Sequence, residues 1–98
     1  MFNIIKKTED NTTTLFLEGR LDTNTAPELE KALADMIDTN DLIMDLEKLA
    51  YVSSAGLRVL LIAQKKMNSL GGMKIVKVTE AVMEILEITG FADILDIE

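Results

Sequence analysis

Two segments near the N-terminus show the alternation of apolar and polar residues that is typical of half-buried β-strands. They are residues 2–7 (FNIIKK) and 12–19 (TTTLFLEG), with a short polar turn sequence between them. In the second segment Leu15 and Leu17 fall on one face and Phe16 on the other, because successive side chains of a strand point to opposite faces. The two segments therefore predict a hairpin at the edge of a sheet.

The next segment predicts a helix. Its apolar residues recur at the spacing of one helical face, and they are Leu29, Leu33, Met36 and Ile37. Asn24 or Thr25 can cap this helix, and Pro27 in its first turn lacks an N–H that would be unpaired there in any case. We expect the helix to end near residues 39–40.

Two apolar segments predict the centre of the domain. Residues 41–49 (DLIMDLEKL) are largely apolar, which favours a strand covered on both faces. A helix from about Ser54 to Leu70 follows, and Gly71–Gly72 is expected to stop it. Residues 73–78 predict a further strand.

The C-terminal part predicts a third helix and a last strand. The helix begins at Thr79 or Glu80, ends at Gly90 and carries the apolar residues Val82, Ile85, Leu86 and Ile88, after which residues 91–98 are expected to form a short strand. This order of elements predicts one α/β domain over residues 1–98, with a mixed sheet of four to five strands and three to four helices.

The composition of the chain excludes several classes of function. The 98-residue chain contains no cysteine and no histidine, so it offers no disulfide, no thiolate or imidazole metal ligand and no histidine base. Its formal net charge of −7 disfavours nucleic acid and anionic membrane surfaces as partners. We expect a cytoplasmic binding module that is not an enzyme and uses no cofactor or metal.

Residues 51–61 (YVSSAGLRVLL) place two serines at the start of the second helix. Ser53 is expected to be the N-cap, which leaves the Ser54 hydroxyl free. A helix N-terminus accommodates a phosphate, and phosphorylation adds roughly −1.5 to −2 charges at neutral pH. Phosphorylation of Ser54 is therefore a hypothesis for a switch that alters partner binding without unfolding the domain.

The same helix predicts a partner surface. At 100° per residue, Ser54, Arg58, Ile62 and Lys65 fall on one outward stripe, and Arg58 is placed to pair with a phosphate on Ser54. We expect Asp22 and Thr23, in the turn after the second strand, to lie at the same end of the sheet. Asp22 is alternatively a simple turn former. Gly56 is expected to permit close packing of the helix on the sheet.

Two blocks of the sequence resemble the STAS domain of bacterial anti-sigma factor antagonists. They are residues 45–61 (DLEKLAYVSSAGLRVLL) and 18–29 (EGRLDTNTAPEL). The resemblance implies that Ser54 is phosphorylated by a partner that is both serine kinase and anti-sigma factor. Where the family often has aspartate, this chain has Ser53, so Ser53 is a second possible acceptor.

The resemblance also implies the partners. They are the anti-sigma factor and a serine phosphatase that restores binding, and the domain is expected to be a monomer or weak dimer. The alternative is a STAS scaffold, or a subunit of a lipid-transport complex, that is never phosphorylated.

Overall fold

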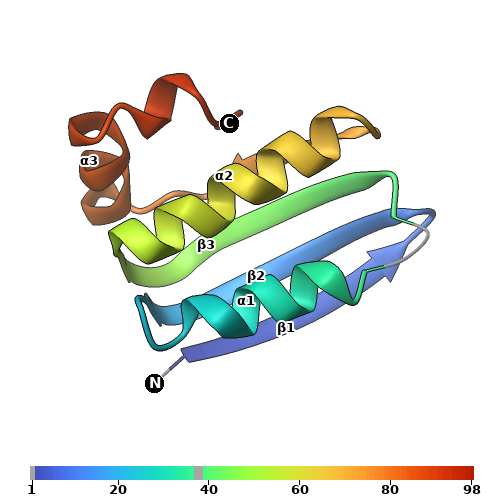
Figure 1. The fold of residues 1–98 in the computed structure, drawn as a ribbon, viewed down its shortest axis with the longest axis horizontal. Helices are drawn as coiled ribbons and strands as arrows, with labels where there is room; N and C mark the ends of the chain where they lie inside the picture. Colours follow the sequence, from blue (N-terminus) through green and yellow to red (C-terminus); the bar gives the residue numbers. More distant parts are fainter. Residues whose placement is uncertain (1, 37–38) are drawn as a thin grey trace.

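The computed structural model describes residues 2–36 and 39–98. The elements in chain order are β1 (Phe2–Glu9), β2 (Thr12–Leu21), α1 (Ala26–Ala34), β3 (Asp41–Val52), α2 (Ser54–Asn68), β4 (Gly72–Val76), α3 (Glu80–Ile88) and the 3₁₀ turn η1 (Phe91–Asp93). The four strands form one sheet in the order β1-β2-β3-β4 (Figure 1). The predicted α/β domain with a mixed sheet is confirmed.

The sheet combines one hairpin with two parallel connections. β1 pairs antiparallel with β2, whereas β2 with β3 and β3 with β4 pair in parallel. Asp10 and Asn11 connect the hairpin with φ angles of 51° and 68°. Positive φ at both turn residues is the geometry that matches the twist of a hairpin, and Asp and Asn tolerate it better than most residues.

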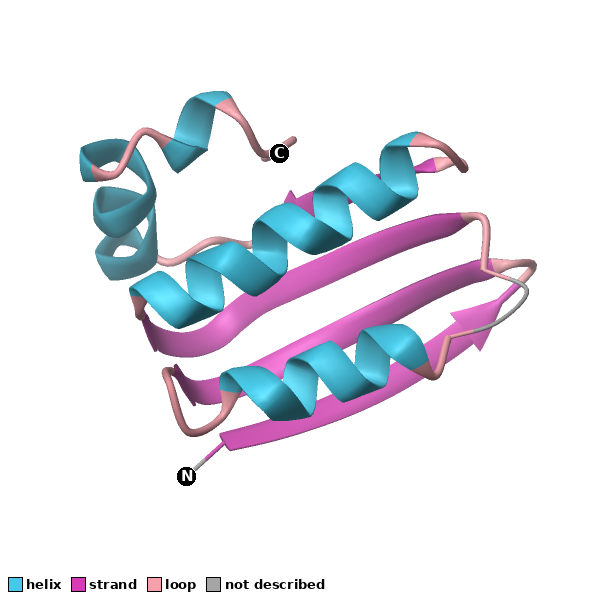
Figure 2. Ribbon diagram, viewed as in Figure 1, coloured by secondary structure: helices cyan, strands magenta, loops and turns pink. Residues whose placement is uncertain are grey.

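Helices α1 and α2 lie side by side on one face of the sheet (Figures 1 and 2). The reason is that the crossovers from β2 to β3 and from β3 to β4 advance in the same direction, and right-handed crossovers then place both helices on the same side. The core between these layers is apolar and includes Leu15, Leu17, Met44, Leu60 and Ile75, each at most 1% exposed. The apolar character of residues 41–49 favours cover on both faces, whereas α1 and α2 both lie on one face.

The first helix is shorter than expected, since α1 ends at Ala34 and not near residues 39–40. The Met36 N–H already bonds the Leu33 carbonyl at 3.3 Å, a tighter 3₁₀-type contact. The Thr39 hydroxyl then bonds the Thr13 hydroxyl at 2.8 Å, which directs the chain into β3. Leu29, Leu33 and Met36 are buried as predicted. Ile37 lies outside the described residues.

The C-terminal segment differs from the prediction. Residues 91–98 form η1 and one isolated bridge, in which Ile97 pairs with Ile75, in place of a fifth strand. Gly90 has a φ of 81° and turns the chain so that Leu95 is buried at 5% exposure. Ile88, expected in the core, is 78% exposed.

Candidate functional site

The ends of β2 and β3 and the start of α2 meet at one end of the sheet. The Ser53 N–H donates to the Leu21 carbonyl at 2.8 Å, so the turn after β2 lies next to the first residues of α2. Asp22 is half-buried and Thr23 is exposed in that turn. The structure therefore brings Asp22 and Thr23 to the same end of the sheet as Ser53 and Ser54, as the sequence predicts.

The two serines at the start of α2 have different environments. Ser53 is the N-cap: its hydroxyl accepts a hydrogen bond from the Gly56 N–H at 3.3 Å, and its side chain is half-buried. Ser54 is the first helical residue and is exposed, and within residues 2–36 and 39–98 no hydrogen bond to its hydroxyl is found. The predicted division into a capping and an exposed serine is confirmed. Ser54 presents its hydroxyl to solvent at the positive end of the helix dipole.

Gly56 permits the close approach of α2 to β2. A Cβ atom at this position would lie 2.8 Å from the Leu21 Cγ and 2.9 Å from the Leu21 carbonyl oxygen. Neither contact is relieved by rotation of a flexible side-chain end, because one involves backbone and the other a side chain that is 0% exposed. The packing role expected for Gly56 is confirmed.

Replacement of Gly56 by alanine is expected to destabilise the domain by about 1–3 kcal/mol, the range for overpacking in a core. At a helical position with free space the same change stabilises by about 1 kcal/mol, so the sign of the effect separates the two cases. Urea unfolding followed by circular dichroism measures the difference. The exposed helical residue Ala81, changed to serine, is the matched control and should alter stability by less than about 0.5 kcal/mol.

Asp22 organises the turn that precedes α1. Its Oδ1 accepts hydrogen bonds from the Asn24 N–H at 3.0 Å and the Thr25 N–H at 3.2 Å, and the Thr25 hydroxyl lies 3.2 Å away. Partial desolvation raises the pKa of Asp22, but the two N–H donors, the Thr25 hydroxyl and the charge of Arg20 together hold the pKa below its usual value of 3.8. The turn-forming role is therefore present. The hydrogen bonds of Asp22 set the position of the exposed Thr23 in this turn.

The depressed pKa of Asp22 predicts a pH dependence. A carboxyl group with a folded-state pKa below its unfolded value stabilises the fold above the unfolded pKa, and that stability is lost as pH falls through the folded pKa. Asp22→Ala is expected to lower the urea midpoint at pH 7, with a difference that shrinks as pH falls below 3.8. A difference that stays constant from pH 7 to pH 2.5 contradicts the ionised role of Asp22. Glu28→Ala, in the first turn of α1, is the control for loss of an exposed carboxylate.

An outward stripe runs along α2 from Ser54. Arg58, Ile62 and Lys65 are all exposed, with Ile62 at 42%, while Leu57, Leu60, Ala63 and Met67 on the other side of the helix are buried. The predicted orientation of the stripe is confirmed. Lys66, which borders the stripe, donates from its Nζ to the Leu33 carbonyl at 3.1 Å and so reaches toward α1.

Charge is segregated on α2. The helix contains Arg58, Lys65 and Lys66 and no aspartate or glutamate, in a chain with 17 carboxylates and a net charge of −7. The stripe is therefore a positive surface with one exposed apolar residue, Ile62, on an otherwise acidic protein.

Sequence reasoning missed Arg20 and Tyr51 at this end of the sheet. The two residues pair across β2 and β3, and the Arg20 guanidinium lies 4.3 Å from the centre of the Tyr51 ring. They are next in sequence to Leu21 and Val52, which are buried, so they project to the other face of the sheet. Only the strand register, which contains a shift between Gly19 and Arg20, places them together.

Residues 2–36 and 39–98 contain no group of three or more aspartate, glutamate, histidine or cysteine side chains arranged to hold a metal ion. In the same part of the chain, no helix has the length and apolar character needed to cross a membrane.

These observations define a class of protein: a small α/β domain whose second crossover helix begins with an exposed serine on a positive stripe. A family profile described as the STAS domain matches residues 3–98. The chain belongs to the STAS domain family.

Relatives of known sequence or structure agree with this assignment. The chain is 32% identical over 98 residues to the anti-sigma-B factor antagonist of Staphylococcus aureus, a match that covers 97% of this chain and 91% of the relative. The fold is similar to that of an anti-sigma factor antagonist from Mycobacterium paratuberculosis, with a TM-score of 0.88, 22% identity and coverage of 99% of this chain and 85% of that one.

A second similar structure is that of the Bacillus cell fate determinant SpoIIAA in its phosphorylated form. Its TM-score is 0.73 at 15% identity, and the match covers 100% of this chain and 91% of that chain. At this level of identity the similarity establishes the fold.

Proposed function

We propose that this protein is an anti-sigma factor antagonist that binds its anti-sigma factor with the start of α2 and the turn after β2. The contact residues are Asp22, Thr23, Ser53, Ser54, Arg58, Ile62 and Lys65. The anti-sigma factor is also a serine kinase, and phosphorylation of Ser54 ends the binding. A serine phosphatase reverses the modification.

The exposure of Ser54 at the first position of α2 carries this proposal. A kinase needs a hydroxyl that is reachable and not engaged in the fold, and Ser54 meets both requirements better than Ser53, whose hydroxyl caps the helix. The helix N-terminus favours the added negative charge, so the folded domain tolerates the phosphate. A docked partner surface then meets a bulky dianion at the start of α2.

The stripe on α2 supports a protein partner. Interfaces combine a central apolar anchor with charged residues at the rim, which is the arrangement of Ile62 between Arg58 and Lys65. The relative from Staphylococcus aureus, whose name describes an antagonist of anti-sigma-B factor, covers nearly the whole of this chain. The structure of SpoIIAA in a phosphorylated form, a protein with the same fold, supports phosphorylation as a switch in this family.

The test combines a pull-down and a phosphorylation assay. The wild type, Ser54→Ala and Ser54→Asp are used as baits in an extract of the source cells, and bound proteins are identified by mass spectrometry. We expect wild type and Ser54→Ala to retain an anti-sigma factor that Ser54→Asp loses. The purified partner with ATP should phosphorylate the wild type and Ser53→Ala but not Ser54→Ala.

Two outcomes contradict the proposal in different ways. Phosphate found on Ser53 alone shows that the capping residue, and not Ser54, is the phosphorylated residue. Retention of a partner without phosphate on Ser53 or Ser54 favours the alternative, a STAS scaffold or a subunit of a lipid-transport complex, in which this end of the domain is a packing contact.

A further inference from the structure

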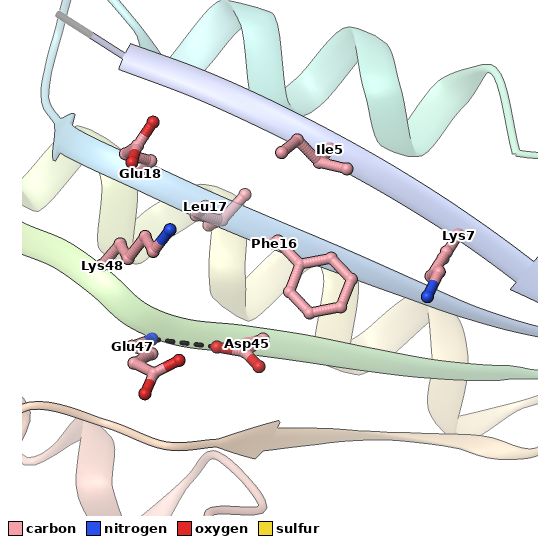
Figure 3. A pocket seen from close by; sticks show the side chains of 8 residues that line it. All are labelled: Ile5, Lys7, Phe16, Leu17, Glu18, Asp45, Glu47 and Lys48. Carbon is pink, nitrogen blue, oxygen red and sulfur yellow. Dashed lines mark hydrogen bonds between the residues drawn. The ribbon is translucent and has the colours of Figure 1, made fainter.

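A second candidate site lies on the face of the sheet turned away from α1 and α2. It is a half-open pocket of about 330 Å³, and in Figure 3 the helices lie behind the strands that form it. Three adjacent strands line it, with Ile5 and Lys7 from β1, Phe16, Leu17 and Glu18 from β2, and Asp45, Glu47 and Lys48 from β3. Its volume is at the lower end of the range for small-molecule sites, about 300–1,000 Å³.

A β-bulge shapes this pocket. Phe16 pairs with Asp45 and Glu18 pairs with Lys48, so Leu17 of β2 lies opposite two residues of β3. The extra residue bends β3 locally, and the Asp45 Oδ1 accepts a hydrogen bond from the Glu47 N–H at 3.0 Å that holds the bend. Bulges of this kind redirect side chains and are common beside functional sites.

Asp45 is the most unusual group in the pocket wall. Its side chain is only 8% exposed, and the salt bridge that it makes within the described residues is a long one to Lys77, whose Nζ lies 3.9 Å from Oδ2 and whose own side chain is 62% exposed. In the described part of the chain, no hydrogen bond to Oδ2 is found. Among the described residues no side-chain oxygen is both buried and without a hydrogen-bond partner, so Oδ2 is reachable from solvent and can accept from a donor supplied by a ligand.

Apolar groups lie next to this carboxylate. The half-buried Phe16 ring stands beside Asp45 in Figure 3, and Ile5, across from Phe16 on β1, is 56% exposed. A ring face attracts a cation, and exposed aliphatic carbon favours an apolar body. The lining carries three carboxylates and two ammonium groups, Lys7 and Lys48. Lys77, whose Nζ lies 3.9 Å from the Asp45 Oδ2, makes the two kinds of group equal in number. A cation is therefore favoured by the position of the Asp45 carboxylate beside the Phe16 ring, and not by the net charge.

We propose that this pocket binds a small organic cation, a guanidinium or primary ammonium group on a short apolar body. The charged group donates to the Asp45 Oδ2, and the body lies on Phe16 and Ile5. Lys77 competes for the same carboxylate and limits the affinity. This site is separate from Ser54, and the proposal does not depend on the function proposed above.

The experiment is a titration of ¹⁵N-labelled protein with n-butylguanidinium, followed by NMR. We expect saturable shifts of the amide signals of Phe16, Asp45 and Glu47, and none of this kind with sodium butyrate, which has a similar body and the opposite charge. Saturable shifts by butyrate, or no saturation with butylguanidinium, overturn the proposal.

Three variants and a control identify the contacts. Asp45→Asn keeps an oxygen for the Glu47 N–H but removes the charge, and should weaken binding about tenfold or more. Lys77→Gln removes the competing cation and should tighten binding. Phe16→Leu keeps an apolar side chain without the ring and should weaken binding, whereas Glu28→Gln, on α1, should have no effect.

Asp45→Asn is expected to weaken binding and Lys77→Gln to tighten it. A general loss of stability cannot tighten binding, so the two variants together separate a lost contact from a destabilised fold. If Asp45→Asn does not fold, as its amide spectrum shows, Lys77→Gln and Phe16→Leu decide. Unchanged affinity in both of these variants overturns the proposal.

Discussion

Replacement of Ser54 by aspartate is expected to weaken binding of the anti-sigma factor by about 100-fold or more while the domain remains folded. A negative charge introduced into an interface costs several kcal/mol when no group of the bound protein pairs with it, and each 1.4 kcal/mol is tenfold in affinity. The same charge at the first position of α2 interacts favourably with the helix dipole, so the free energy of unfolding should stay constant or rise by about 0.3–1 kcal/mol.

The matched control is Ser54→Asn, which has the size of the aspartate variant and no charge. Isothermal titration calorimetry gives the affinity of each variant, and urea unfolding gives its stability. We expect the asparagine variant to lose far less affinity than the aspartate variant. Equal losses show that bulk and not charge disturbs the contact, and full binding by Ser54→Asp removes Ser54 from the interface.

Replacement of Ile62 by glutamate is expected to weaken the same complex by about 30-fold or more, because central apolar anchors contribute about 2 kcal/mol or more to an interface. Ile62 is 42% exposed between Arg58 and Lys65, and glutamate there also places a negative charge between the two cations of the stripe. Since the side chain already points to solvent, the stability of the free domain should change by less than about 0.5 kcal/mol.

The chain offers a close control for this prediction. Ile88 is 78% exposed on α3, so Ile88→Glu introduces the same charge on an exposed helix that is not part of the proposed surface. The control variant should bind as tightly as the wild type in calorimetry. Equal weakening by both variants indicates a general effect of net charge, and unchanged binding by Ile62→Glu rules out the stripe as the contact surface.

The exposed α2 stripe was predictable because helical periodicity is a local property. Leu57, Leu60, Ala63 and Met67 face the sheet, and that alone leaves Ser54, Arg58, Ile62 and Lys65 facing outward. Capping is equally local, so Ser53 could be assigned from its place before the apolar run. Whether the exposed residues contact a partner is not a local property, and it stays a prediction.

The errors fall where long-range contacts override a local pattern. The apolar residues of 91–98 suited a strand, but the turn at Gly90 and the burial of Leu95 leave only the bridge between Ile97 and Ile75. The pairing of Arg20 with Tyr51 depends on a register shift that no residue pattern shows. The bulge that leaves Asp45 in a pocket wall depends on the register of β2 and β3 in the same way.

The order of the elements from β1 to α3, the N-cap at Ser53 and the outward face of α2 could be read from the sequence, because these follow from the spacing of apolar residues and the chemistry of one helix end. Which face of the sheet stays uncovered, and which side chains meet across strands, could be seen only in the folded domain. Crossover direction and strand register set those contacts, and both join residues far apart in the chain.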